Sequence, residues 1–308
     1  MNNRRPAASA VGILPGTAKV NPTTVQPIAV FDSGIGGLTV VRALRDCLPH
    51  EDIVYFGDTA RVPYGTKTRE TVTRFTLENC AFLMRMSPKC IVAACHTVSA
   101  VAVPSIAGEF PVPLIGVVGP GADAAVRGCG PRDLIAVAAT EATVRSNAYK
   151  NAIAAIDAGR PVVQAACPLF VPLAEEGIDA ADPIVRLAVS RYLGPVRRLS
   201  PAAMVLGCTH YPMLRDAIAE FFGGGVTLID PAAATAQLVE RTLRAMNALS
   251  PSKGRGSLHC YVSDDPSRFQ VLGSRFLGEP IPDVVRVCPD ELGIAAGDAA
   301  VAAACRRA

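Results

Sequence analysis

Residues 28–40 read IAVFDSGIGGLTV, and this stretch indicates the class of fold. Four apolar residues, Ile28–Phe31, are followed at once by Asp32, Ser33 and a glycine-rich turn. A short, continuous apolar run is typical of a strand that is covered on both faces, and the turn leads into a segment of helical period. The pattern is that of a strand, a loop and a helix in a parallel α/β sheet.

The same unit recurs along the chain from Pro27 onward, because short runs rich in Val and Ile alternate with longer segments of helical period. The runs that we interpret as buried strands are Ile28–Phe31, Ile53–Phe56, Cys90–Ala94, Leu114–Val118, Leu134–Ala138, Val162–Ala165, Met204–Leu206 and Thr227–Ile229. Their alternation with helices predicts an α/β fold made of two doubly wound units.

Two predicted helices have recognisable ends. Gly223 is placed to end a helix over Met213–Phe222. Asp230 and Pro231 are typical of the cap and first residue of the next helix, whose apolar face we extend to Leu249.

The composition limits the classes of protein. The chain has 308 residues, of which half are hydrophobic and 19% are charged, and this balance supports one large or two moderate domains and excludes a disordered chain. Its 30 basic and 27 acidic residues leave a net charge of +3, which gives no indication of nucleic-acid binding. Because no apolar run reaches the roughly 18 residues of a transmembrane helix, we expect no membrane span.

Ten cysteines are too few in a chain of this length to build a disulfide scaffold, and their lack of paired spacing favours the reducing cytoplasm. Residues 1–26 are rich in Pro, Ala, Thr and Asn. Their apolar patch, Ala10–Leu14, is shorter than the core of a secretion signal. We therefore expect residues 1–26 to form a disordered tail.

In doubly wound folds, ligands bind where the carboxyl ends of the strands meet, so the residues that follow each strand are the candidates for function. Polar residues and glycines follow strands at positions that can converge on one crevice: 32–37 (DSGIGG), 57–65 (GDTARVPYG), 95–97 (CHT) and 207–211 (GCTHY).

The first of these loops allows a nucleotide-binding interpretation. The backbone N–H groups of Gly34, Gly36 and Gly37 could approach a phosphate. However, the dinucleotide pattern would require glycine at Thr39, and no Walker lysine follows. An anion-binding turn for a carboxylate explains the same glycines. Asp32 has two open roles, in the chemistry of the site and as the cap of the helix that follows.

Two cysteines at strand ends give a more specific signal. Cys95 and Cys208 each have a His and a Thr within the next two positions, and they lie 113 residues apart (208 − 95), about one α/β unit. Amides at a helix N-terminus and neighbouring donors lower a thiol pKa and make the thiolate available as a base or nucleophile. A zinc site that adds His96 and His210 is an alternative, but the short C-x-x-C pairing of a structural zinc site is missing.

Seven blocks of the sequence resemble, in order, the glutamate racemases of the cofactor-independent aspartate/glutamate racemase superfamily. The blocks are IAVFDSGIGGLTV (28–40), YFGDTARVPYG (55–65), ACHTVSA (94–100), ATVRSNAY (142–149), CPLFVPLAEEG (167–177), MVLGCTHYPML (204–214) and YVSDDPSRF (261–269). The resemblance implies two pseudo-symmetric, doubly wound α/β domains with mostly parallel sheets and the active site between them. The first domain would comprise residues 27–118 with 232–308, and the second residues 119–231.

The resemblance also implies an activity, the interconversion of L- and D-glutamate without pyridoxal phosphate or metal, which supplies D-glutamate for peptidoglycan in the cytoplasm. Inversion at Cα requires removal of a proton from one face and delivery of another to the opposite face. Cys95 and Cys208, on opposite domains, would be the two bases. The implied partner is the small-molecule substrate glutamate, with no nucleic acid and no membrane, and a homodimer is left open.

Neighbouring side chains take roles from the same resemblance. Asp32 would assist Cys95 in proton transfer, and His210 with Glu175 would assist Cys208. The substrate-binding positions would be Asp32, Ser33, Tyr64, Gly65, His96, Thr97, Thr143, Thr209 and His210. Among them, Ser33, Tyr64, Gly65, Thr97 and Thr209, with Thr143 as a further candidate, would offer hydroxyl and backbone donors to carboxylates.

Simpler interpretations stay open at this stage. Glu175 also fits an ordinary solvated helix carboxylate, like its neighbour Glu176, and His210 also fits a core imidazole bonded to backbone. For the whole chain, the alternatives are another isomerase of the superfamily and a non-catalytic binding protein that keeps the fold. The presence of both cysteines argues against the superfamily's decarboxylases, which keep one.

The chain departs from the family's pattern at His96, where the family has Asn after the first catalytic cysteine. Either side chain can donate a hydrogen bond to a carboxylate, but imidazole is larger and can carry a charge. We expect His96 to point into the crevice and to be neutral, because an imidazolium would repel the ammonium group of an amino-acid substrate.

Overall fold

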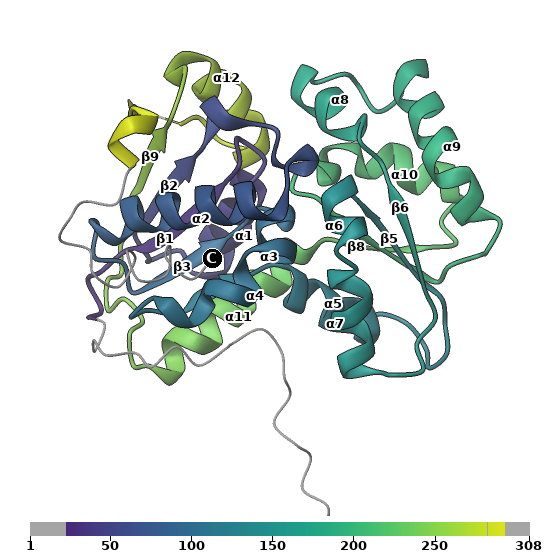
Figure 1. Cartoon of the computed structure of the whole chain (residues 1–308), viewed down its shortest axis with the longest axis horizontal. Coiled ribbons are helices and arrows are strands. Elements are labelled where there is room, and N and C mark those ends of the chain that lie inside the picture. Colours follow the sequence, from purple (N-terminus) through teal and green to yellow (C-terminus); the bar gives the residue numbers. More distant parts are fainter. Residues whose placement is uncertain (1–22, 282, 293–308) are drawn as a thin grey trace, which may run out of the picture.

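The computed structural model describes residues 23–281 and 283–292, which form two parallel β-sheets flanked by helices (Figure 1). The first sheet has six strands in the order β10-β9-β2-β1-β3-β4, and the second has four in the order β6-β5-β7-β8. Every strand pair is parallel. The predicted α/β fold with mostly parallel sheets is confirmed.

The strands of the first sheet are β1 (Ile28–Asp32), β2 (Ile53–Gly57), β3 (Cys90–Ala93), β4 (Leu114–Gly116), β9 (Leu258–Val262) and β10 (Val284–Arg286). Those of the second sheet are β5 (Ile135–Ala139), β6 (Val162–Ala166), β7 (Ala203–Gly207) and β8 (Thr227–Ile229).

The α-helices are α1 (Leu38–Cys47), α2 (Arg69–Met84), α3 (His96–Val101), α4 (Val103–Ile106), α5 (Val118–Arg127), α6 (Glu141–Arg145), α7 (Ala148–Ile156), α8 (Phe170–Glu176), α9 (Pro183–Arg197), α10 (Arg215–Phe222), α11 (Pro231–Ala245) and α12 (Pro266–Leu277). Short 3-10 turns are formed by Thr59–Arg61, Tyr64–Thr66, Ala107–Glu109, Tyr211–Leu214 and Pro289–Leu292.

Helices cover both faces of the first sheet. On one face, Val30 and Tyr55 belong to a buried cluster with residues of α1, α11 and α12. On the other face, Phe31 and Phe56 pack with α2, α3 and α4, and the rings of Phe56 and Phe82 lie 5.1 Å apart. Because both faces are buried, the central strands are continuously apolar, and these apolar runs are what predicted the strands from the sequence.

The second sheet is covered in the same way. Helices α8, α9 and α10 pack on one face, whereas α5 and α7 pack on the other. The cluster that contains α5 and α7 is continuous with the core around α2 and α3, so apolar packing joins the two halves of the molecule. No helix within the described residues combines the length and apolar character needed to cross a bilayer.

Each of the eight predicted strands is present, with small differences at the ends. The fourth is shorter than expected, because β4 ends at Gly116 and Val118 already begins α5. Strands β9 and β10 were not predicted. In β9 only alternate residues are buried, and β10 is a short, exposed strand at the edge of the sheet, so neither shows the continuous apolar run of a central strand.

The predicted helix ends are largely confirmed. Gly223 follows α10 in the left-handed conformation, with φ of 64°, and the side chain of Asp230 accepts a hydrogen bond from the N–H of Ala232. Two boundaries differ: the segment from Met213 begins as a 3-10 turn before α10, and α11 ends at Ala245, so Leu249 lies beyond it.

Part of the expected disordered tail lies within the described residues. Residues 23–26 form a turn in which Gln26 N–H donates to the carbonyl of Thr23. The buried ammonium of Lys89 donates to the carbonyl of Thr24. The rest of the expected tail, residues 1–22, lies outside the described residues.

Candidate active site

A cavity of about 190 Å³ lies where the carboxyl ends of strands from both sheets meet. The predicted site residues that line it are Ser33, Tyr64, Gly65, Cys95, His96, Thr97, Cys208, Thr209 and His210. Further residues that line the cavity, and that were not among the predicted site residues, are Pro63, Thr66, Thr140, Glu141, Pro168, Val171 and Pro172. The four sequence loops that were expected to converge therefore do so on one cavity.

Cys95 lies between β3 and α3, as the residue that precedes the first turn of α3. Its sulfur lies 3.7 Å from the hydroxyl oxygen of Ser33. Burial raises the pKa of Cys95 to about 12, and the charge of the nearby Asp32 carboxylate adds to this shift. Both effects favour the neutral thiol form of Cys95.

Asp32 is buried at the end of β1, and one carboxylate oxygen accepts a hydrogen bond of 2.9 Å from the N–H of Gly34. Burial raises the pKa of this carboxyl group, while the charge of His210 opposes the rise. Of the two roles left open for Asp32, the cap of the next helix is not the one that the structure shows. Gly37 occupies the capping position of α1, and no side chain bonds to the helix there.

The glycines of this loop allow a close approach between the two halves of the molecule. A Cβ atom on Gly36 would lie 2.4 Å from Oγ1 of Thr209 and 2.5 Å from Nδ1 of His210, too close for any side chain. The hydroxyl of Thr39 donates to the carbonyl of Thr209 at 3.3 Å. The loop therefore packs on the segment that follows Cys208. This packing explains the glycines without a bound nucleotide.

On the opposite side of the cavity, Cys208 follows β7 and belongs to a chain of polar contacts. Its sulfur lies 3.8 Å from Nδ1 of His210, and Nε2 of the same ring lies 2.9 Å from a carboxylate oxygen of Glu175. Thr209 Oγ1 lies 3.4 Å from Nδ1. The structure thus favours the functional interpretation of Glu175 and His210 over the simpler ones.

Electrostatics in this chain favour a charged imidazole. Burial by itself would lower the pKa of His210, but the hydrogen bonds with Cys208 and Glu175 raise it to about 10. The hydrogen bond with His210 in turn lowers the pKa of Glu175. Both shifts describe an imidazolium that is paired with a carboxylate and faces the sulfur of Cys208.

Tyr64 was predicted to offer a donor to the substrate. In the structure its hydroxyl is bonded within the protein instead. The hydroxyl donates to the buried carboxylate of Asp58 and accepts a hydrogen bond of 3.3 Å from the side chain of Asn79. The adjacent Gly65 packs on Thr140, because a Cβ atom on this glycine would lie 3.0 Å from that of Thr140. The loop lines the cavity through Pro63, Tyr64, Gly65 and Thr66.

Three threonine hydroxyls form a chain beside the cavity. Oγ1 of Thr97, from α3, lies 3.0 Å from Oγ1 of Thr140, which lies 3.0 Å from Oγ1 of Thr143. Thr143 is fully buried and does not line the cavity, whereas Thr140 does. Thr140, which also caps α6, is therefore the threonine of this segment that lines the cavity, and it was not among the predicted site residues.

His96 lines the cavity as expected and is buried. Its ring stacks on that of Tyr149, with centroids 6.1 Å apart and an angle of 26° between the planes. Burial lowers the pKa of His96 to about 3, so the side chain is neutral. Neither ring nitrogen has a hydrogen-bond partner among the described residues, which leaves both free for a bound molecule.

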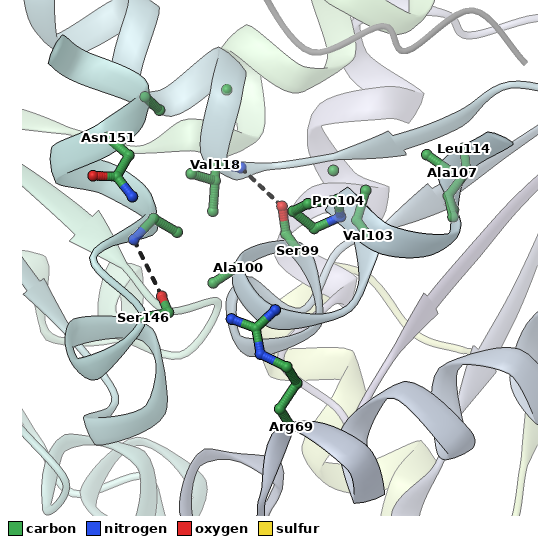
Figure 2. Close-up of a pocket in the computed structure, with 14 residues that line it drawn as sticks. Arg69, Ser99, Ala100, Val103, Pro104, Ala107, Leu114, Val118, Ser146 and Asn151 are labelled. Carbon is green, nitrogen blue, oxygen red and sulfur yellow. Dashed lines mark hydrogen bonds between the residues drawn. The ribbon is translucent and has the colours of Figure 1, made fainter. Parts of the chain in front are cut away.

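A larger cavity of about 550 Å³ lies elsewhere, between α3, α4 and the start of α7 (Figure 2). Two of its polar side chains are bonded to the protein backbone: the hydroxyl of Ser99 accepts from Val118 N–H, and Arg69 donates to the carbonyl of Val101. The lining residues include no thiol, imidazole or carboxylate. The smaller cavity is therefore the one equipped for proton transfer.

The described residues contain no group of three or more His, Cys, Asp or Glu side chains arranged to hold a metal ion. The zinc alternative for Cys95, His96, Cys208 and His210 therefore has no ligand set in this part of the chain.

Comparisons with known proteins agree with this geometry. The profile of the Asp/Glu/Hydantoin racemase family matches residues 38–239. A curated glutamate racemase of Geobacter metallireducens is 46% identical over 264 residues, which cover 85% of this chain and 96% of the relative.

Solved structures of glutamate racemases have the same fold. The enzyme from Francisella tularensis in complex with D-glutamate matches with a TM-score of 0.80 and 36% identity, covering 87% of this chain and 99% of that one. The enzyme from Thermus thermophilus in complex with β-chloro-D-alanine matches with a TM-score of 0.77 and 44% identity, with the same coverage.

Proposed function

Since the chain belongs to the Asp/Glu/hydantoin racemase family and resembles its glutamate racemases over most of its length, we propose that it interconverts L- and D-glutamate by proton transfer between two thiols. The activity is that of a cofactor-independent isomerase. The substrate is a small molecule, as the relatives solved with D-glutamate and β-chloro-D-alanine illustrate.

The observation that carries this proposal is the placement of Cys95 and Cys208. They follow strands of different sheets, yet both line the same small cavity, so an amino acid bound between them has a sulfur on each side. Racemisation needs one group to remove the Cα proton and another to deliver a proton to the opposite face.

We assign different starting states to the two sulfurs. Cys95 is a neutral thiol and holds the proton to be delivered. The His210 imidazolium, held by Glu175, faces Cys208 and stabilises negative charge on its sulfur, so the thiolate acts as the base. In this direction Cys208 takes the Cα proton and Cys95 donates its own to the other face. After this step Cys208 is the thiol and Cys95 is the thiolate. The reverse reaction, which starts from the other enantiomer, restores the starting states of both sulfurs.

The intermediate carries negative charge beside the α-carboxylate, and the cavity supplies groups to stabilise it. Ser33, Thr97 and Thr209, which carry hydroxyl groups, line the cavity together with Gly65 and the neutral His96. Donors fixed in place and shielded from water lower the energy of such charge more than water does. A neutral His96 also avoids repulsion with the substrate ammonium.

The direct test is circular dichroism of L-glutamate incubated with the purified chain and no added cofactor. The signal should fall to zero, and D-glutamate should give the same end point from the opposite sign. An unchanged signal with both enantiomers would refute the assignment.

Three wider properties extend the proposal. We place the protein in the cytoplasm, where D-glutamate would enter peptidoglycan synthesis. The nine cysteines within the described residues are all free, which suits a reducing compartment.

We keep the two domains at residues 27–118 with 232–308 and at 119–231, because each sheet is built within one of these sets. A homodimer would double the mass of 32.1 kDa in light scattering.

A further inference from the structure

We propose that Ser263 is a positioning residue for the substrate loop, defined as residues 58–65, and that it acts through the buried carboxylate of Asp58. The inference rests on the proposed function, because it concerns what holds Tyr64 and Gly65 against the glutamate cavity. Ser263 directly follows β9 and lies 205 residues after Asp58 in the sequence.

Asp58 is the centre of the loop. It follows β2 and is fully buried, and a buried carboxylate requires a paired charge and hydrogen bonds. Nε of Arg61 donates to both of its oxygens, at 2.9 and 2.7 Å. The guanidinium also bonds to Glu78 and donates to the side-chain oxygen of Asn79 at 2.9 Å. These contacts tie the loop to α2.

Tyr64 depends on the same carboxylate. Its hydroxyl donates to Oδ2 of Asp58 and accepts from Asn79, and its ring lies 5.5 Å from that of Phe75. The orientation of Tyr64 sets where the backbone of Gly65 meets the cavity. Asp58 therefore controls the position of the binding groups although it does not line the cavity itself.

Ser263 fixes Asp58 from the other side. Its hydroxyl donates to Oδ1 of Asp58 and accepts from the N–H of Ala60, both at 2.9 Å, and its own N–H donates to the carbonyl of Gly57 at 3.1 Å. The N–H of Asp264 donates to Oγ1 of Thr59 at 2.9 Å. One buried serine thus bonds to the start of the loop and to the carboxylate that orients its end.

Without the hydroxyl, Oδ1 of Asp58 keeps Arg61 as its donor, but the N–H of Ala60 loses its acceptor. Oδ1 has then lost one of its two side-chain donors and the start of the loop is held less firmly, so the positions of Tyr64 and Gly65 are less well fixed. Small displacements of binding groups weaken productive binding before they alter the reacting thiols. The expected signature is a change in KM rather than in kcat.

The first experiment compares Ser263→Ala with Ser274→Ala in the full-length protein. Ser274, in α12, is a matched control, because its hydroxyl donates to the carbonyl of Gln270 and accepts from the N–H of Ile281 outside the loop. Ser263→Ala should raise KM for both enantiomers by about 2- to 13-fold, the range for one net hydrogen bond, with kcat changed less than about threefold. Ser274→Ala should keep the wild-type KM. Equal KM increases in the two variants would overturn the proposal.

A double-mutant cycle with Tyr64→Phe tests the route through Asp58. Groups that act through a shared partner have coupled effects, whereas independent groups multiply their effects on KM. The double variant should therefore show a KM increase close to that of the larger single variant. A KM increase in the double variant equal to the product of the two single increases would contradict the coupling of Ser263 to Tyr64 through Asp58.

Calorimetric titration of L-glutamate separates the two proposals. A wild-type protein that racemises glutamate, together with a Ser263→Ala variant of unchanged Kd and KM, would overturn the positioning role and leave the proposed function intact. A Kd raised about 2- to 13-fold in Ser263→Ala supports the positioning role whether or not racemisation is seen.

Discussion

Nε2 of His210 lies 2.9 Å from Oε1 of Glu175, while Nδ1 of the same ring lies 3.8 Å from the sulfur of Cys208. One imidazole therefore connects a carboxylate on α8 with a thiol after β7. Because the carboxylate and the sulfur both favour the charged ring, the pKa of His210 rises to about 10 in spite of burial. This relation makes the second half of the site sensitive to pH.

Glu175→Gln should move the basic limb of kcat/KM to lower pH. The carboxylate favours the imidazolium form, so its replacement by a neutral amide lowers the pKa of His210. His210 then loses its proton earlier as the pH rises, and the thiolate of Cys208 loses its counter-charge. The measurement is kcat/KM for both enantiomers from about pH 6 to pH 10.

Glu176→Gln is the matched control for this profile, because Glu176 is the next residue of α8 and is exposed. Its profile should coincide with that of the wild type. A basic limb that moves equally in both variants, or in neither, would contradict the role given to Glu175.

Cys95→Ser and Cys208→Ser should each reduce racemisation by at least about 10²-fold, since positioned acids and bases are typically worth 10²–10⁴ in rate. Each thiol faces one side of the substrate. Each variant should therefore still eliminate a good leaving group from one enantiomer of a β-substituted substrate, and the preferred enantiomer should be opposite in the two. Turnover near that of the wild type in either variant would refute the two-base assignment.

His96→Asn should preserve kcat within about tenfold, because the neutral ring contributes at most a hydrogen bond and Asn can replace it. Since the pKa of His96 is lowered to about 3, the ring carries no charge over the working range, and its loss should leave the acid limb of kcat/KM in place. Displacement of that limb to higher pH by about one unit would show that His96 is protonated and lowers the pKa of Cys95.

Exhaustive dialysis against EDTA should leave the activity unchanged, and added pyridoxal phosphate should not increase it. The proposed proton transfers use only thiols, an imidazole and carboxylates of the chain. Loss of activity on dialysis, with recovery on addition of zinc, would sink this prediction.

The sequence predicted the central strands because burial on both faces leaves a continuous apolar run, as in Ile28–Phe31. It also placed Cys95 and Cys208 at one crevice, since the carboxyl ends of parallel strands meet at one edge. Strands β9 and β10 were not predicted, because only alternate residues of β9 are buried and β10 is short and exposed.

Side-chain partners could not be obtained from spacing alone. Glu175 and Glu176 are adjacent and chemically identical, and only the packing of α8 against the turn that begins at Tyr211 brings one of them to His210. The commitment of the Tyr64 hydroxyl to Asp58 was hidden for the same reason. Tertiary contacts decide which hydrogen-bond donor is bonded within the protein and which one faces the cavity.

The most direct test of the two-thiol account is racemisation of L-glutamate in D₂O, followed by circular dichroism and by the proton NMR signal at Cα. Because one thiol removes the proton and the other delivers a solvent-derived one, the D-glutamate formed in the first turnovers should carry deuterium at Cα, and the dichroism should fall to zero. D-glutamate that retains the original Cα proton would show that one group both removes and returns it, and would contradict the assignment of Cys95 and Cys208 to opposite faces.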